Sequence, residues 1–133
     1  MCKKKSATVL VVDDDPVILD LVKEQISEYG YEPILASNGK EAMEAANKKN
    51  RIDLLLTDIM MPGINGIDLA RQFLTLYPET RVLFMSGFMC PSLAHFIPDT
   101  ERAFLQKPFQ IHNLIAKMRS ILSGPVVQPG LLS

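Results

Sequence analysis

Three carboxylates follow one another directly after an apolar run near the start of the chain. The stretch "VLVVDDDP" consists of four aliphatic residues, then Asp13, Asp14 and Asp15, then a proline. Like charges placed together at the end of a buried strand are unfavourable, because burial and mutual repulsion both raise the pKa of each carboxyl group. A hard divalent cation removes this penalty, and Mg²⁺ prefers few carboxylates, several waters and a phosphate oxygen. The stretch therefore predicts a metal site.

Three more residues that could do chemistry each follow an apolar run. "LLLTDIMMPGINGIDL" places Asp58 at the end of such a run, "VLFMSG" places Ser86 there, and "FLQKPF" places Lys107 there. The carboxyl ends of parallel strands meet at one edge of a sheet, so these side chains and the first acids are expected to converge if the strand order is 2-1-3-4-5. A hydroxyl and an ammonium facing an acidic Mg²⁺ site donate to the oxygens of a transferring phosphoryl group. The combination predicts phosphoryl chemistry.

The apolar pattern supplies the elements that must position these groups. Continuous apolar runs are typical of strands covered on both faces, and the predicted strands are residues 8–12, 33–36, 53–56, 81–85 and 103–105. Helical spacing predicts helices at residues 18–29 with Gly30 as the stop, at 42–46 opened by Ser37-Asn38, at 67–77 and at 111–122. A helix before the last strand is expected to be short, about residues 91–96, because prolines interrupt that segment. The alternation predicts an α/β fold, a doubly wound five-stranded parallel sheet with a short or irregular fourth helix.

Length and composition indicate one globular domain. The 133 residues are 47% apolar and 22% charged, and we expect a basic N-terminal leader at 1–7, the domain at 8–123 and an irregular C-terminal tail at 124–133. The formal net charge of −1 offers no general attraction for nucleic acid or anionic lipid, so no nucleic acid binding is expected. No run approaches the ~18 apolar residues of a membrane span, so no membrane insertion is expected. Cys2 and Cys90 have no metal or redox spacing, which favours a cytoplasmic location.

In their order along the chain, the four motifs "VLVVDDDP", "LLLTDIMMPGINGIDL", "VLFMSG" and "FLQKPF" resemble the receiver domain of bacterial two-component response regulators. The resemblance covers residues 8–122, nearly the whole chain. It implies a flavodoxin-like (βα)5 fold with the strand order 2-1-3-4-5. It also implies a phosphoacceptor domain in a two-component phosphorelay, which is not an enzyme for a separate substrate but catalyses its own phosphorylation and dephosphorylation.

The resemblance also implies roles for the acidic residues. Asp58 matches the phosphoacceptor, whose carboxylate attacks phosphorus to give an acyl phosphate. Asp14 matches a direct ligand of Mg²⁺ or Mn²⁺, and Asp13 matches a residue that acts through metal-bound water. The backbone carbonyl of Met60, two residues after the acceptor, matches the remaining protein ligand.

Residues on the last two strands match the phosphoryl-binding and switch positions. Ser86 and Lys107 match the side chains that hold phosphoryl oxygens, and Lys107-Pro108 resembles the family's cis peptide bond. Phe104 matches the aromatic switch residue. The resemblance implies that Ser86 moves toward the phosphoryl group and that Phe104 then fills the vacated space.

The expected partner is a histidine kinase or a histidine phosphotransfer protein, which donates from phosphohistidine. The combined stretch "TRVLFMSGF…AFLQKPF" looks most like receivers at the carboxyl end of hybrid sensor histidine kinases. The alternative is a free-standing single-domain response regulator, because the chain begins with methionine and carries no DNA-binding domain.

A phosphatase of the haloacid dehalogenase type is a distant alternative, with Asp13 as nucleophile and Asp15 as acid–base. That family needs a further acidic pair after the lysine, and no Asp or Glu follows Lys107. We instead expect Asp15 to be the N-cap of the first helix, with Pro16 in its first turn.

Some neighbours of the acceptor are expected to have simpler roles. Gly63 and Gly66 follow Pro62 and are predicted to be ordinary turn formers. Met60 and Phe88 are large and apolar, and they are expected to crowd the water that would attack an acyl phosphate, so that its loss is slow.

Overall fold

Five parallel strands form one sheet in the order β2-β1-β3-β4-β5. The computed structural model describes residues 7–49, 51–87 and 104–123. The strands are β1 (Thr8–Val12), β2 (Glu32–Ala36), β3 (Leu54–Asp58), β4 (Arg81–Ser86) and β5 (Phe104–Gln106). The order is the predicted 2-1-3-4-5, and every neighbouring pair is parallel. Each predicted strand is present, with bounds that differ by at most two residues.

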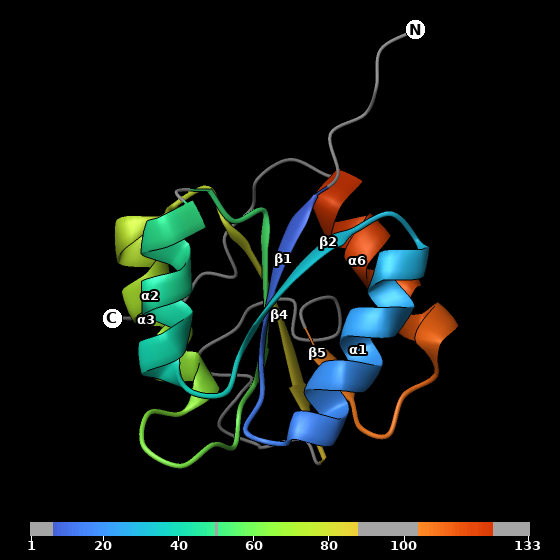
Figure 1. The fold of residues 1–133 in the computed structure, drawn as a ribbon, viewed down its shortest axis with the longest axis horizontal. Helices are drawn as coiled ribbons and strands as arrows, with labels where there is room; N and C mark the ends of the chain where they lie inside the picture. Colours follow the sequence, from blue (N-terminus) through green and yellow to red (C-terminus); the bar gives the residue numbers. More distant parts are fainter. Residues whose placement is uncertain (1–6, 50, 88–103, 124–133) are drawn as a thin grey trace, which may run out of the picture.

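Helices cover both faces of the sheet, as expected for a doubly wound fold. Within the described residues they are α1 (Pro16–Glu28), α2 (Gly39–Lys49), α3 (Gly66–Leu76) and α6 (Ile111–Ser123). Figure 1 shows α2 and α3 against one face and α1 and α6 against the other. Helix α2 is longer than the predicted range 42–46, which was based on three apolar residues. The short helix expected at 91–96, almost all of the basic leader and the C-terminal tail lie outside the described residues.

Two hydrophobic layers explain why the strands have continuous apolar runs. Every residue of β1 and β3 is buried, and successive side chains point to opposite faces. Leu10 and Leu55 pack with Phe73 of α3 in one layer. In the other layer, Val11 packs with Met118 of α6. A strand buried on both faces has no solvated position for a polar residue until it ends.

The residues predicted to begin and end the first helix are found at the two ends of α1. The Asp15 side chain accepts a hydrogen bond from the Val17 N–H at 2.9 Å, and Pro16 occupies the first turn of α1. This confirms that Asp15 is an N-cap. Gly30, with a φ of +89°, follows the end of α1.

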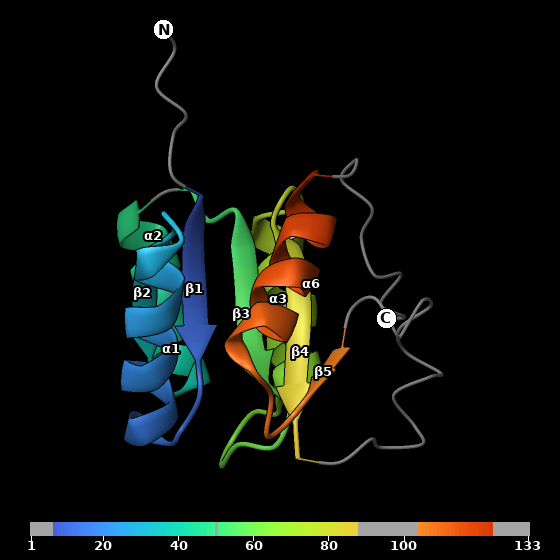
Figure 2. The same ribbon diagram turned by 90° about the vertical axis from the view of Figure 1, so that its right-hand side faces the viewer.

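The parallel strands bring their carboxyl ends to one edge of the molecule. Figure 2 shows the arrowheads of β1 and β4 pointing toward the same edge. Asp13, Asp58, Ser86 and Lys107 each end or follow a strand at this edge. None of the described helices combines the length and apolar character that crossing a bilayer requires.

Candidate functional site

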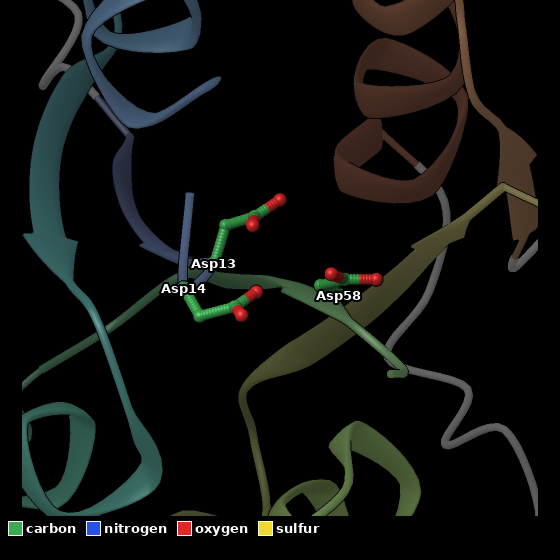
Figure 3. A group of neighbouring side chains, drawn as sticks. All are labelled: Asp13, Asp14 and Asp58. Carbon is green, nitrogen blue, oxygen red and sulfur yellow. The ribbon is translucent and has the colours of Figure 1, made fainter. Parts of the chain in front are cut away.

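Three carboxylates gather where β1 and β3 end. Val12 and Thr57 are register partners in these neighbouring strands, so Asp13 and Asp58 follow at the same level. One carboxylate oxygen from each of Asp13, Asp14 and Asp58 lies within 4.8 Å of the others (Figure 3). Asp13 is only 1% exposed and Asp58 6%, whereas Asp14 is exposed. The convergence predicted from the sequence is therefore present.

Lys107 reaches this acidic group from the end of β5, which lies at the other end of the strand order from β2 and β1. Its Nζ lies 2.6 Å from Asp13 Oδ2 and 3.3 Å from Asp58 Oδ2. The lysine follows β5, and its backbone N–H donates to the Ser86 carbonyl at 2.7 Å. The Lys107-Pro108 peptide bond is cis, as the resemblance implied. One ammonium therefore faces the two buried carboxylates.

Burial and charge act in opposite directions on these groups. Burial is the largest influence on the pKa of Asp58 and raises it, while the charge of Lys107 opposes this and the charge of Asp13 adds to it. Burial works to lower the pKa of Lys107. The hydrogen bond to Asp13 and the charges of Asp13 and Asp58 outweigh burial, so the pKa of Lys107 is raised. The site thus holds a protonated lysine beside Asp58, and the lysine does not fully offset the effect of burial on the pKa of that carboxyl group.

The donor set fits a hard divalent cation. Three carboxyl groups can supply up to three negative charges here, and Lys107 offsets one of them. Asp13 Oδ1 accepts a hydrogen bond from the Asp15 N–H at 2.9 Å, and Asp13 Oδ2 accepts one from Lys107. Both Asp13 oxygens therefore already have protein partners, whereas Asp14 presents an exposed carboxylate at the mouth of the site. Carboxylate oxygens with a net charge of about −2 are typical of a Mg²⁺ or Mn²⁺ site.

The remaining predicted residues lie on or beside the same strands. Ser86 is buried at the end of β4, and its register partner is Gln106 of β5. Phe104 is buried opposite Phe84 in the layer that α2 and α3 cover. Met60 has an exposed side chain, and its N–H points to Asp58 Oδ1 at 3.4 Å. Phe88 lies outside the described residues.

Gly66 corrects one sequence expectation. Gly63 has a φ of +82° and is a turn former, but Gly66 is the first residue of α3. A Cβ at Gly66 would overlap the Asp58 carbonyl oxygen and lie 2.9 Å from the Ile59 Cα. Helix α3 therefore touches the backbone at the end of β3 at a point where only glycine fits. The sequence offers no signal for this close approach beyond a glycine eight residues after Asp58.

The buried threonine beside the acceptor was not singled out from the sequence either. Thr57 Oγ1 donates a hydrogen bond to the Asp58 carbonyl at 2.9 Å. The only sequence signal is a polar residue that interrupts an apolar strand immediately before Asp58.

Comparison with known proteins agrees with this geometry. Residues 9–119 match the family model described as the response regulator receiver domain. The chain is similar to the autoinducer 1 sensor kinase/phosphatase LuxN of Vibrio campbellii, with 39% identity over 62% of this chain and 10% of that protein. It is also similar to the response regulator MprA of Mycobacterium ulcerans, with 31% identity over 88% of this chain and 50% of that protein. The chain thus spans half or less of the length of these relatives.

Solved structures show the same likeness. The receiver domain of the hybrid histidine kinase CckA superposes with a TM-score of 0.74 and 29% identity, over 87% of this chain and 99% of that domain. The whole described fold, including the edge that carries the acids, is therefore of a kind seen in solved receiver domains.

Proposed function

This chain belongs to the response regulator receiver domain family of two-component systems, and on that premise we propose that it accepts a phosphoryl group on Asp58. The observation that carries the proposal is the meeting of Asp58 with Asp13, Asp14 and Lys107 at one edge of the sheet. The domain is proposed to span residues 8–123, with the leader 1–7 and the tail 124–133 outside it.

The proposed reaction is transfer from phosphohistidine to the Asp58 carboxylate. A carboxylate oxygen of Asp58 attacks phosphorus, the P–N bond breaks, and its electron pair stays on the imidazole nitrogen, which takes up a proton from solvent. The product is an acyl phosphate. Attack by water on phosphorus later releases inorganic phosphate and restores the carboxylate. In both steps the protein acts on its own side chain.

Each neighbour of Asp58 has a proposed part in this reaction. Asp14, Asp58 and the Met60 carbonyl would hold Mg²⁺ or Mn²⁺ directly, and Asp13 would hold it through water. A bound divalent cation supplies charge neutralisation for the phosphoryl oxygens. Lys107, already 3.3 Å from Asp58 Oδ2, is placed to donate to a phosphoryl oxygen on that carboxylate.

Signalling is proposed to follow from the added charge. A phosphoryl group adds about −1.5 to −2 units of charge beside Ser86 and Lys107. The Ser86 hydroxyl then moves toward it, and Phe104, which lacks a tyrosine hydroxyl, responds by packing alone. The phosphoryl group stabilises one of two existing arrangements of β4, β5 and α6 through its differential affinity for them.

Receiver domains interact with histidine kinases or phosphotransfer proteins, and an apolar surface beside the acids suits such a partner. Val17 is 69% exposed and Leu21 46% exposed, one turn apart on α1 directly after the acids. With Met60, they are three of the five large hydrophobic side chains that are exposed among the described residues. We propose that a phosphohistidine-bearing protein docks here in the cytoplasm.

The parent protein is proposed to be a hybrid sensor histidine kinase, which the similarity to LuxN and to the CckA receiver domain supports. A free-standing single-domain response regulator is the alternative; MprA supports a response regulator as the parent protein, although the match covers only 50% of MprA.

Intact-mass spectrometry tests the acceptor. The wild type, treated with acetyl phosphate and Mg²⁺, is expected to gain one phosphoryl group. Asp58→Asn should gain none, whereas the matched variant Asp68→Asn, at an exposed carboxylate on α3, should gain one. A phosphoryl group that persists in Asp58→Asn would contradict the assignment, and a hydrolase using Asp13 would give that result.

A further inference from the structure

The peptide unit that joins Asp58 to Ile59 is held on both sides. Its carbonyl oxygen accepts a hydrogen bond from Thr57 Oγ1 at 2.9 Å. Its N–H, which belongs to Ile59, donates to the Met85 carbonyl of β4 at 3.0 Å. The orientation of this peptide plane is therefore set by one side-chain hydroxyl and one backbone acceptor.

The hydroxyl of Thr57 sits where water cannot replace it. Thr57 is 0% exposed, so its hydroxyl and the carbonyl that it contacts depend on each other for a partner. Gly66 lies against the same carbonyl oxygen and donates its own N–H to the Ile59 carbonyl at 2.9 Å. The region is packed closely enough that a rotated peptide would collide with α3.

We propose that the Thr57 hydroxyl is a positioning group for the phosphoacceptor. By fixing the Asp58 carbonyl, it fixes the direction in which the Asp58 side chain leaves the backbone. It also fixes the path of the chain to Met60, whose N–H points to Asp58 Oδ1. Thr57 is not among the residues proposed to hold the phosphoryl group or the metal, and its hydroxyl contacts the Asp58 carbonyl, so its effect on the reaction passes through Asp58. This inference rests on the proposed function.

Removing the hydroxyl lets the peptide tilt by the small amount that the packing against α3 and the Ile59–Met85 hydrogen bond still allow, and this tilt misaligns the carboxylate. Reactions that depend on alignment lose up to ~10²-fold in rate for misplacements near 1 Å. A partial rotation within a packed site should therefore slow phosphorylation on the order of tenfold, at saturating Mg²⁺ and acetyl phosphate. Because alignment rather than donor binding is disturbed, the loss should appear in the maximal rate and not in the acetyl phosphate concentration at half-maximal rate.

Three substitutions separate the hydroxyl from the methyl group of Thr57. Thr57→Val keeps the volume and removes the hydroxyl, and it should be slow. Thr57→Ser keeps the hydroxyl and loses a buried methyl group, so it should be less stable yet phosphorylated within about twofold of the wild-type rate. Thr57→Ala loses both, and its comparison with Thr57→Ser isolates the hydroxyl if the valine variant does not fold.

A matched control removes an equivalent bond elsewhere. Thr80 is also buried, and its Oγ1 donates to the Ile52 carbonyl at 2.8 Å, at the opposite edge of the sheet. Thr80→Val should lower the thermal midpoint and leave the phosphorylation rate unchanged. A purely structural role for Thr57 predicts that rate follows stability across all four variants. The proposal predicts that rate follows the hydroxyl at position 57 alone.

The outcomes are distinct. A slow valine or alanine variant beside a fast serine variant supports the proposal. If the wild type is phosphorylated and the variants without the hydroxyl keep its rate, or if Thr57→Ser is as slow as Thr57→Ala, the inference is wrong and the proposed function stands. If the wild type gains no phosphoryl group, the proposed function fails and the inference fails with it.

Discussion

The close approach of α3 to the acceptor strand makes Gly66→Ala a sharp test of the geometry. An added Cβ would overlap the Asp58 carbonyl oxygen and lie 2.9 Å from both the Asp58 carbonyl carbon and the Ile59 Cα. All of these are backbone atoms, so no side-chain rotation relieves the overlap. Helix α3 or the end of β3 must therefore move by about 1 Å, because close-packed interiors leave no spare volume.

The stability cost follows from this displacement. Overpacking costs about 1–3 kcal/mol, and a backbone collision belongs at the upper end of that range. Alanine favours a helix over glycine by up to about 1 kcal/mol, which offsets part of the cost. The net loss is expected to be about 2 kcal/mol, or a fall of ~8 °C in the thermal midpoint for a domain of this size.

The functional cost should be larger than the stability cost implies. The atoms that must move include the Asp58 carbonyl, so the phosphorylation rate with acetyl phosphate and Mg²⁺ should fall at least about tenfold even where the variant is fully folded. Circular dichroism gives the midpoint, and intact-mass time courses give the rate.

Gly63→Ala, in the loop that precedes α3, is the matched control. Gly63 has a φ of +82° and open space around its Cα, so alanine costs about 1 kcal/mol of backbone strain without reaching Asp58. Its phosphorylation rate should stay near that of the wild type. A Gly66→Ala variant with wild-type midpoint and rate would refute the close approach, and equal rate losses in the two variants would refute its link to Asp58.

Four further predictions concern charge and docking. Lys107→Met removes the ammonium 2.6 Å from Asp13 Oδ2, so calorimetry should find tighter Mg²⁺ binding together with slower phosphorylation; weaker Mg²⁺ binding would count against competition between lysine and metal. The raised pKa of Asp58 means that, in metal-free buffer, its carboxyl group should take up a proton at a pH above the ordinary carboxyl value of 3.8, which an NMR titration of the side chain would show. A group whose pKa is raised by folding contributes stability while it is protonated and loses it as the pH rises through the folded pKa. Ionised Asp58 is therefore destabilising at neutral pH, and Asp58→Asn should raise the thermal midpoint in metal-free buffer at pH 7; a lowered midpoint would contradict the cited shift. Leu21→Glu should slow transfer from a phosphohistidine protein and leave acetyl phosphate transfer intact, whereas Leu76→Glu, also exposed but at the far end of α3, should change neither rate.

Much of the site was predictable because each of its groups ends or follows a strand. Lys107 and Asp13 are 94 positions apart in the chain, yet their ion pair follows from two apolar runs that end at one edge of a parallel sheet. Asp15 was predictable as a cap because capping depends on a few adjacent residues. Distance in sequence was no obstacle where the topology was regular.

The features that escaped prediction depend on tertiary distances of a few tenths of an ångström. Gly66 lies in a motif rich in turn residues, and only the packing of α3 on β3 shows why a side chain cannot fit there. The partner of the Thr57 hydroxyl depends on a rotamer and on a local peptide orientation. Neither the close approach at Gly66 nor the hydrogen bond of Thr57 produces a periodic pattern in the sequence. The switch position Phe104 is described, but Phe88 and residues 91–96 lie outside the described part of the chain.

The ion pair between Lys107 and the two buried acids has a consequence for the life of the protein before it receives any signal. A buried carboxylate without a counter-charge is costly, and here the chain carries its own cation to that place. We therefore expect newly made molecules to fold without metal, and on the proposed function a chelator should leave them folded but unable to accept a phosphoryl group. On that proposal, folding and readiness to receive a phosphoryl group are separate events, and the supply of metal is expected to govern only the second.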